Sequence, residues 1–133
     1  MGNRAVITTV DGWKNNGIGI YLHWNGGKDS IEAFLKYCKL RGFRNGDYGM
    51  ARLTQIIANF FGGELSIGID TIDHLDTDNG DNGTYIIDTD AWEIIDRKFM
   101  NYHEQTEYDI DEFLHDIDNK QPEEDRIYKD ESN

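Results

Sequence analysis

Carboxylates are the commonest side chains of this 133-residue chain that could do chemistry, and they gather in its second half. Up to Ile69 the chain carries eight Lys or Arg and five Asp or Glu, whereas the remainder carries five and 21, a net charge of −16. Such a surface repels nucleic acid and anionic membranes, and it attracts basic proteins over a Debye length of roughly 8 Å. We therefore expect a basic protein partner and no direct binding to nucleic acid or membrane.

Two rows of carboxylates are the candidate partner-binding residues. On a helix, side chains three or four positions apart have Cβ atoms about 5–6 Å apart, a spacing comparable with that of neighbouring phosphates on a nucleic-acid strand. The rows therefore predict mimicry of a nucleic-acid backbone, and an acidic surface that serves only solubility is the alternative. The first row is Asp109, Glu112 and Asp116, and the second is Asp70, Asp73, Asp76, Asp78 and Asp81.

A glycine pair marks a second candidate site, in the segment NGGKDS at residues 25–30. Glycines before a helix let backbone N–H groups point at an anion, and the helix dipole adds to the attraction. This segment resembles the SGGxDS loop of the PP-loop nucleotide pyrophosphatases, which implies pyrophosphate binding. The nucleotide-binding residues would then be Asn25, Gly26, Gly27, Lys28 and Ser30, with Arg52 near the phosphates. A tight turn with a helix cap from Asp29 or Ser30 is the structural alternative.

Residues 76–83 (DTDNGDNG) are similar to a calcium loop, with Asp76, Asp78 and Asp81 as the candidate ligands. Counted from Asp76, the glycine and the glutamate that an EF-hand requires at positions six and twelve are Asp81 and Ile87 here. Asp and Asn are also common turn residues. The sequence therefore favours a turn over a metal site. Because no nucleophile or metal-protease motif is present, we expect neither a cofactor nor enzymatic activity.

The apolar spacing predicts the elements that position these residues. Helices are expected from Asp29 to Arg41, with Gly42 as the C-cap, and from about Asp47 to Phe61. Strands are expected at 4–10, 17–24, 65–70, 84–88 and 91–96, with a turn at 11–12. The order ββ-αα-βββ predicts an α+β fold with a mainly antiparallel sheet of about five strands, covered by the two helices.

The C-terminal segment has its own composition. Residues 104–133 contain 12 acids and three bases, and Ile110, Phe113, Leu114 and Ile117 keep helical spacing. We expect an α+β domain at 1–100, followed at 101–133 by an acidic helix and a tail that is mobile after Asn119. The single cysteine, Cys38, and the lack of an apolar leader predict a cytoplasmic protein.

The central block is similar to a group of small, mostly uncharacterised proteins of bacteriophages and mobile elements in Gram-positive bacteria. The resemblance implies a phage-type protein, and small acidic phage proteins include inhibitors of host defence such as anti-CRISPR and anti-restriction proteins. The similarity is carried by GIYLHWNGGKDSIEAFLKYCKLRGFR (19–44), YGMARLTQIIANFFGG (48–63), LSIGID (65–70) and LDTDNGDNGTYII (75–87).

Charge and resemblance together predict an inhibitor of a bacterial nucleic-acid-targeting defence complex. It would bind a basic groove of a protein such as a CRISPR effector, within the host cytoplasm, and block access of nucleic acid. One alternative is a protein that binds a nucleotide or signalling nucleotide at residues 25–30. Another is an acidic structural or regulatory protein whose tail only aids solubility.

Overall fold

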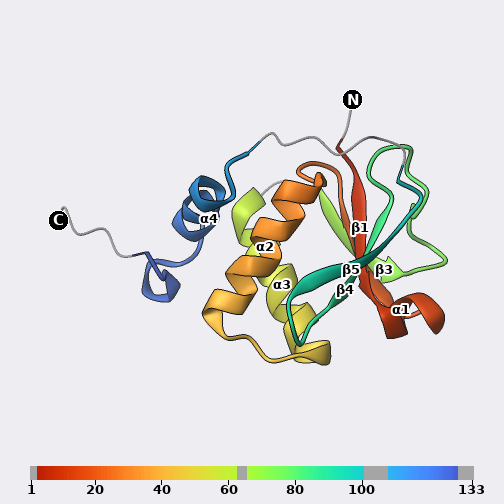
Figure 1. Cartoon of the computed structure of the whole chain (residues 1–133), viewed down its shortest axis with the longest axis horizontal. Helices are drawn as coiled ribbons and strands as arrows, with labels where there is room; N and C mark the ends of the chain where they lie inside the picture. The colour runs from red at the N-terminus through yellow and green to blue at the C-terminus, as the bar shows by residue number, and fades with distance from the viewer. Residues whose placement is uncertain (1–2, 63–65, 101–107, 129–133) are drawn as a thin grey trace.

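The computed structural model describes residues 3–62, 66–100 and 108–128, and its five strands form one sheet in the order β3-β2-β1-β4-β5 (Figure 1). All neighbouring strands are antiparallel except β1 and β4, which are parallel. The predicted α+β fold with a mainly antiparallel sheet is therefore confirmed. The strands are β1 (Ala5–Thr9), β2 (Ile18–Leu22), β3 (Ile67–Thr71), β4 (Thr84–Asp88) and β5 (Glu93–Lys98).

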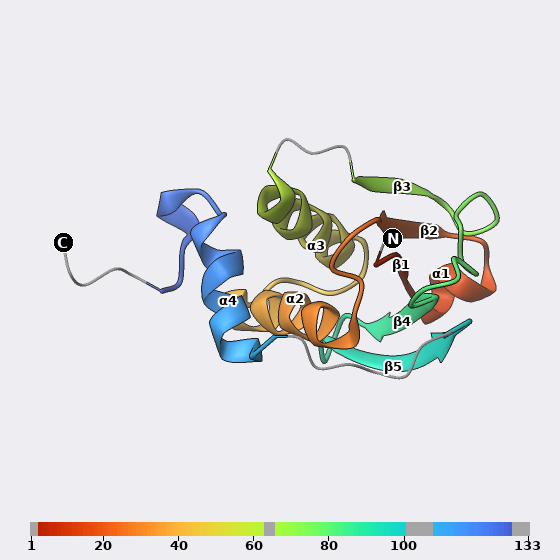
Figure 2. The same cartoon turned by 90° about the horizontal axis from the view of Figure 1, so that it is seen from above.

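The long helices stack in layers on one face of this sheet. Helices α2 and α3 lie against the sheet, and α4 packs on the side of α2 that faces away from it (Figure 2). Gly42 ends α2 with a left-handed backbone (φ 71°), as predicted. The helices are α1 (Val10–Lys14), α2 (Lys28–Arg41), α3 (Gly46–Phe61) and α4 (Ile110–Asn119), followed by a 3-10 turn, η1 (Glu123–Asp125).

Alternating apolar residues of the central strands form the floor of the core. Ile7 of β1 is paired with Ile20 of β2 and Tyr85 of β4, and all three side chains are buried. Above them, the ring of Phe34 on α2 contacts Phe60 of α3 and Phe113 of α4, with centroids 5.5 and 5.7 Å apart. The boundary expected at residue 100 therefore separates two stretches of chain that share one apolar core.

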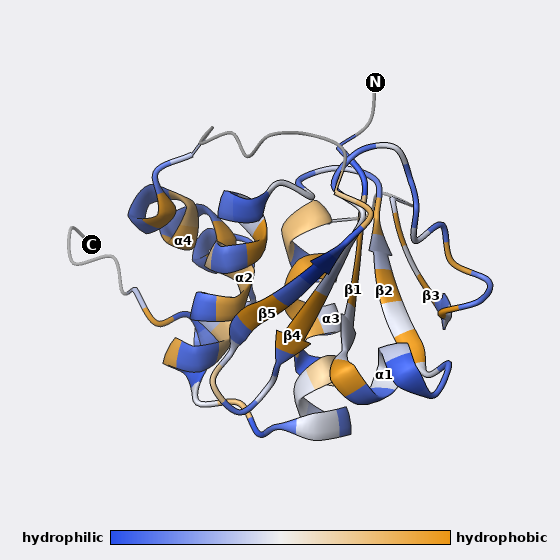
Figure 3. Cartoon of the chain, turned by 45° about the vertical axis from the view of Figure 1, so that its right-hand side comes forward, coloured by the Kyte–Doolittle hydropathy of each residue, from blue (hydrophilic) through white to orange (hydrophobic). Residues whose placement is uncertain are grey.

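The opposite face of the sheet is covered by the loop between β3 and β4. A Cβ atom at Gly19 would lie 2.9 Å from side-chain carbons of both Ile72 and Leu75, so the loop packs directly on β2. Figure 3 shows orange hydrophobic stretches among blue and white ones in the strands, and hydrophilic residues interleaved with hydrophobic ones along α4.

Two local predictions were wrong. The turn expected at 11–12 is part of the short helix α1, which begins after Thr9 because the Thr9 hydroxyl accepts a hydrogen bond from the Gly12 N–H (3.0 Å). Strand β5 begins at Glu93 rather than residue 91, since Trp92 has a positive φ (56°) and a ring buried beside Gly49. The β4–β5 pairing contains an irregularity at Ile86/Ile87 that is typical of a bulge.

The expectation of a mobile tail after Asn119 is also wrong for residues 120–128. Gln121 is buried, where its amide accepts a hydrogen bond from Asn59 and donates to the carbonyls of Ile56 and Ile117. Hydrogen bonds of a buried polar side chain thus fix this segment to α3 and α4, and the spacing of apolar residues does not indicate such contacts. Residues 101–107 and 129–133 of the predicted C-terminal region, and Leu65 of the predicted third strand, lie outside the described residues.

Candidate functional site

Helix α4 is fixed to the rest of the protein by a buried carboxylate. Asp118 is 0% exposed, and its oxygens accept hydrogen bonds from the Tyr37 hydroxyl of α2 and from the N–H groups of Ile127 and Tyr128. Burial and the bond to Asp118 raise the pKa of Tyr37. The carboxylate therefore ties together α2, α4 and the segment that follows η1.

The first predicted row lies on the solvent side of this anchored helix. Asp109, Glu112 and Asp116 are exposed, and at about 100° per residue they fall within roughly 60° of one another around the helix axis. We call the exposed carboxylates of α4 and η1 the α4–η1 acidic segment. It comprises Asp109, Asp111, Glu112, Asp116, Glu123 and Glu124.

The carboxylates of the α4–η1 acidic segment differ in the hydrogen bonds and ion pairs that they form within the protein. Asp109 is the N-cap of α4, and its carboxylate accepts hydrogen bonds from the N–H groups of Asp111 and Glu112. Asp111 forms an ion pair with Lys36 of α2, with N and O 3.8 Å apart. Within the described part of the chain, Glu112 and Asp116 have no ion pair, so their charge is directed at solvent.

The second predicted row lies at the other end of the molecule. Figures 1 and 2 both place β3 and the loop after it at the end of the long axis opposite α4. The two rows therefore do not form one continuous acidic surface. The row contains Asp70, Asp73, Asp76, Asp78 and Asp81.

Asp81 is a structural residue rather than part of an exposed row. Its side chain is 6% exposed and accepts hydrogen bonds from both the backbone N–H (3.1 Å) and the Nε (2.8 Å) of Arg4. Arg4 also lies 3.6 Å from the carboxylate of Asp76. These contacts pin the β3–β4 loop to β1, so part of the negative charge of the second row is neutralised by the protein itself.

The start of the same row is a local network. Asp70 and Asp73 lie 3.4 and 3.7 Å from the Nδ1 atom of His74, and the Thr71 hydroxyl donates a 2.6 Å hydrogen bond to Asp73. The bond from Thr71 lowers the pKa of Asp73. Asp78 is exposed, with no ion pair to a described residue.

The three metal candidates do not converge. Asp81 is committed to Arg4, whereas Asp76 and Asp78 face solvent. Across residues 3–62, 66–100 and 108–128, no group of three or more His, Cys, Asp or Glu side chains is arranged to hold a metal ion. Cys38 is buried in α2, and burial raises the pKa of its thiol, so the reactive thiolate is disfavoured.

The NGGKDS loop leads into α2, but its geometry is that of a structural turn. Gly26 packs against β1, because its N–H donates to the Asn3 carbonyl (2.8 Å) and a Cβ there would lie 2.5 Å from the same oxygen. Its carbonyl accepts a hydrogen bond from the Tyr85 hydroxyl (2.6 Å). Close packing of the backbone thus explains this glycine without a ligand.

A carboxylate already lies at the N-terminus of α2, where an anion would bind. Asp29 is 8% exposed, and its oxygens accept hydrogen bonds from the N–H groups of Ser30 (2.7 Å) and Tyr108 (2.8 Å). The predicted cap by Asp29 or Ser30 is wrong, since Gly27 is the N-cap and makes no side-chain bond. A phosphate here would have to approach the Asp29 carboxylate, which repels it.

Among the remaining residues of the nucleotide-binding prediction, Arg52 is far from the loop. Lys28 is at the first position of α2 and forms an ion pair with Glu32 (3.6 Å). Arg52 lines a pocket together with Arg41, the last residue of α2. Arg41 is thirteen residues from Lys28, which corresponds to about 20 Å along the helix axis. Asn25 has a positive φ (58°) and shapes the turn. The structure therefore brings the loop residues together but leaves Arg52 at the opposite end of the helix.

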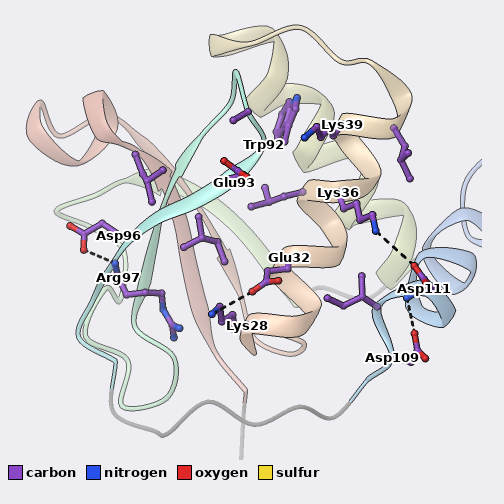
Figure 4. Close-up of a pocket in the computed structure, with 16 residues that line it drawn as sticks. Lys28, Glu32, Lys36, Lys39, Trp92, Glu93, Asp96, Arg97, Asp109 and Asp111 are labelled. Atoms are coloured by element: carbon purple, nitrogen blue, oxygen red, sulfur yellow. Dashed lines mark hydrogen bonds and ion pairs between the residues drawn. The ribbon is translucent and has the colours of Figure 1, made fainter.

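A groove with a volume of about 1140 Å³ lies between α2 and β5 (Figure 4). Lys28, Lys36 and Lys39 of α2 form one wall, and Glu93 and Asp96 of β5 belong to the other. Its floor is apolar, and the N-terminus of α4 closes one end. The mixed charges and the mutual ion pairs of this groove do not favour one ligand charge over the other.

Reasoning from the sequence missed three parts of this region. Gln121 and Asp118 anchor the acidic helix, but buried polar residues in an acidic stretch have no periodic signal. Arg41 was predicted only as the last residue of a helix, whereas it also faces Asp125 of η1 at 3.9 Å. Glu123 and Glu124 were assigned to a mobile tail, although η1 holds them next to α4.

Comparisons with protein-family models, with curated proteins and with solved structures gave no match to this chain. The helices of the described residues also lack the length and apolar character needed to cross a membrane.

Proposed function

We propose that this protein is a non-enzymatic inhibitor that binds a basic groove of a nucleic-acid-targeting complex and blocks access of nucleic acid. The α4–η1 acidic segment is the contact surface, and the α+β domain is the rigid support. The partner class is a bacterial defence nuclease, such as a CRISPR effector, which fits the resemblance to small phage proteins. The link from small acidic phage proteins to inhibitors of host defence is an analogy of size, charge and context.

One observation carries the proposal: exposed carboxylates lie on a helix that the core holds firmly. Phe113 and Leu114 are buried against α2, and Asp118 adds three hydrogen bonds on the inner side of α4. Glu112 and Asp116 are thereby presented to solvent from a fixed backbone. Preorganised charges lose little conformational entropy when a partner binds, which favours affinity as well as a fast encounter.

Because the two acidic rows are separated, the proposed contact surface is restricted to the end of the molecule that carries α4. A basic groove that receives α4 would lie at the end of the molecule opposite β3 and the loop after it. The Asp70–Asp78 end contributes only to the long-range attraction, which is screened beyond about a Debye length. The two ends consequently provide a matched comparison within one chain.

Two triple variants test the proposal. The first, Glu112→Gln, Asp116→Asn and Glu124→Gln, removes three charges from the α4–η1 acidic segment. The second, Asp70→Asn, Asp73→Asn and Asp78→Asn, removes three from the other end. Truncation of α4 is unsuitable, because it would uncover Phe34 and Phe60 of the core. Both variants and the wild type are added to DNA-cleavage assays with a panel of purified RNA-guided nucleases.

We expect the wild type to inhibit at least one nuclease and the α4 variant to lose about tenfold or more in inhibition. The matched variant should retain inhibition within about threefold. Equal losses in both variants would mean that only total charge matters. An absence of inhibition across the panel, or full inhibition by the α4 variant, would contradict the proposal.

A further inference from the structure

A small polar pocket of about 270 Å³ lies where the end of α2, the middle of α3 and η1 meet. Two guanidinium groups, from Arg41 and Arg52, line it, together with the side-chain amides of Gln55 and Asn59. Asp125 is the carboxylate in its lining. A pocket with two arginines and several amides suits an oxyanion, because guanidinium groups donate paired hydrogen bonds to phosphate or carboxylate oxygens.

Arg41 is partly buried and lies against two aromatic rings. Its side chain is only 18% exposed, and its guanidinium lies 5.0 Å from the ring centre of Phe43 and 5.8 Å from that of Tyr37. Within the described part of the chain, its one ion pair is with Asp125 at 3.9 Å, which is too long for a hydrogen bond. The aromatic rings thus orient a partly buried guanidinium that lines the pocket.

Arg52 is the more accessible of the two cations. It is exposed on α3, and its guanidinium donates a 3.0 Å hydrogen bond to the amide oxygen of Gln55, one turn further along the helix. This bond leaves the amide nitrogen of Gln55 as a further donor beside the pocket. Asn59 is held by Gln121, so this part of the lining is fixed.

We propose that this pocket binds a phosphate-type oxyanion, which Arg41 and Arg52 contact together. The carboxylate of Asp125 occupies the neighbourhood of Arg41 in the described structure and competes with the ligand. The site is distinct from the α4–η1 acidic segment, and it is independent of the proposed inhibitory function. It also lies at the opposite end of α2 from the NGGKDS loop.

The test is a titration of the full chain with inorganic phosphate and with pyrophosphate, followed by NMR of the side-chain amides of Gln55, Asn59 and Gln121. Acetate at the same ionic strength is the carboxylate comparison. We expect saturable shifts with dissociation constants on the order of 1 mM for phosphate, and weaker binding of acetate. Equal affinity for acetate would overturn the assignment of a phosphate-type ligand.

Three variants identify the site. Asp125→Asn removes the competing carboxylate and should tighten binding about threefold, whereas Arg52→Gln should weaken it about tenfold. Arg44→Gln, which removes the same charge from an exposed residue outside the pocket, should leave the affinity unchanged. The proposal is overturned if neither the wild type nor Asp125→Asn shows shifts up to about 20 mM phosphate. Equal effects of Arg44→Gln and Arg52→Gln would also overturn it.

Discussion

The hydroxyl of Tyr37 donates a hydrogen bond to the carboxylate of Asp118, a residue 81 positions later in the chain. Both side chains are 0% exposed. A buried carboxylate without partners is strongly unfavourable, so the bond is part of a set that allows Asp118 to be buried at all. The acidic helix thus depends on one of its own acids facing inward.

This burial predicts different effects for two neighbouring aspartates. Asp118→Asn keeps the shape but presents an NH₂ group or an uncharged oxygen to three donors, and we expect it to lower the free energy of unfolding by about 1–3 kcal/mol. Asp116→Asn, on the exposed side of the same helix, should change it by less than about 0.5 kcal/mol. Urea unfolding followed by circular dichroism measures both, and equal effects would contradict the assigned roles.

Stability should also fall at alkaline pH. Burial raises the pKa of the Cys38 thiol and, together with the bond to Asp118, that of the Tyr37 hydroxyl above their ordinary values of 9.0 and 10.0. In the unfolded chain both groups lose their protons near those ordinary values, whereas the folded chain retains them. The contribution of each group to stability is therefore complete below its ordinary pKa and is lost as the pH rises above it.

The measurement is the urea midpoint between about pH 7 and pH 10.5, compared with that of Cys38→Ala. The variant lacks the thiol, so its midpoint should decline less steeply above about pH 9 than that of the wild type. Parallel profiles for the two proteins would show that the thiol does not contribute.

The Arg4–Asp81 pair should control the loop between β3 and β4. Arg4→Gln removes the cation that lies 2.8 Å from a nearly buried carboxylate, and we expect it to loosen the attachment of this loop to β1. Hydrogen exchange of the amides of residues 72–83 should accelerate. Lys14→Gln, on the exposed side of α1, is the control and should leave that exchange unchanged.

Two glycines with similar backbone angles should respond unequally to alanine. Gly83 has φ 69°, and an added Cβ would lie 2.1 Å from the carbonyl oxygen of Lys98, so Gly83→Ala should destabilise by about 3 kcal/mol or more. Gly42 has φ 71° with open space around it, so Gly42→Ala should cost only about 1 kcal/mol. Thermal unfolding distinguishes them, and similar losses would show that Gly83 is not crowded.

Inhibition by the α4–η1 acidic segment should depend on salt mainly through association. Raising the salt from about 50 to 300 mM should slow the association rate with an inhibited nuclease several-fold and change the dissociation rate less. Surface plasmon resonance measures the two rates separately. An association rate that does not change with salt would argue against electrostatic attraction.

The helices with strong apolar spacing could be predicted from the sequence, and the buried polar contacts could not. Ile31, Phe34 and Leu35 of α2 follow the helical repeat and are all buried. The parallel pairing of β1 with β4 has no local signal, since it joins strands about 78 residues apart. Helix α1 is five residues long and contains Gly12, so local propensity favours a turn there.

The candidate site was predicted in part for the same reason. The exposure of Asp109, Glu112 and Asp116 follows from helix geometry, and the structure contains this first row as predicted. The distance between the two acidic rows depends on the strand order, which places β3 at the sheet edge away from α4. Burial of Asp81 depends on Arg4, which lies 77 residues earlier.

The irregular pairing at Ile86/Ile87 affects how the protein meets other copies of itself. It lies opposite β5, an outer strand of the described sheet, whose Asp96 and Lys98 side chains are 3.2 Å apart and half-exposed. An incoming strand would find a kinked backbone bordered by charges instead of a flat ladder of hydrogen-bonding groups. Edge-to-edge aggregation through β5 is thereby discouraged.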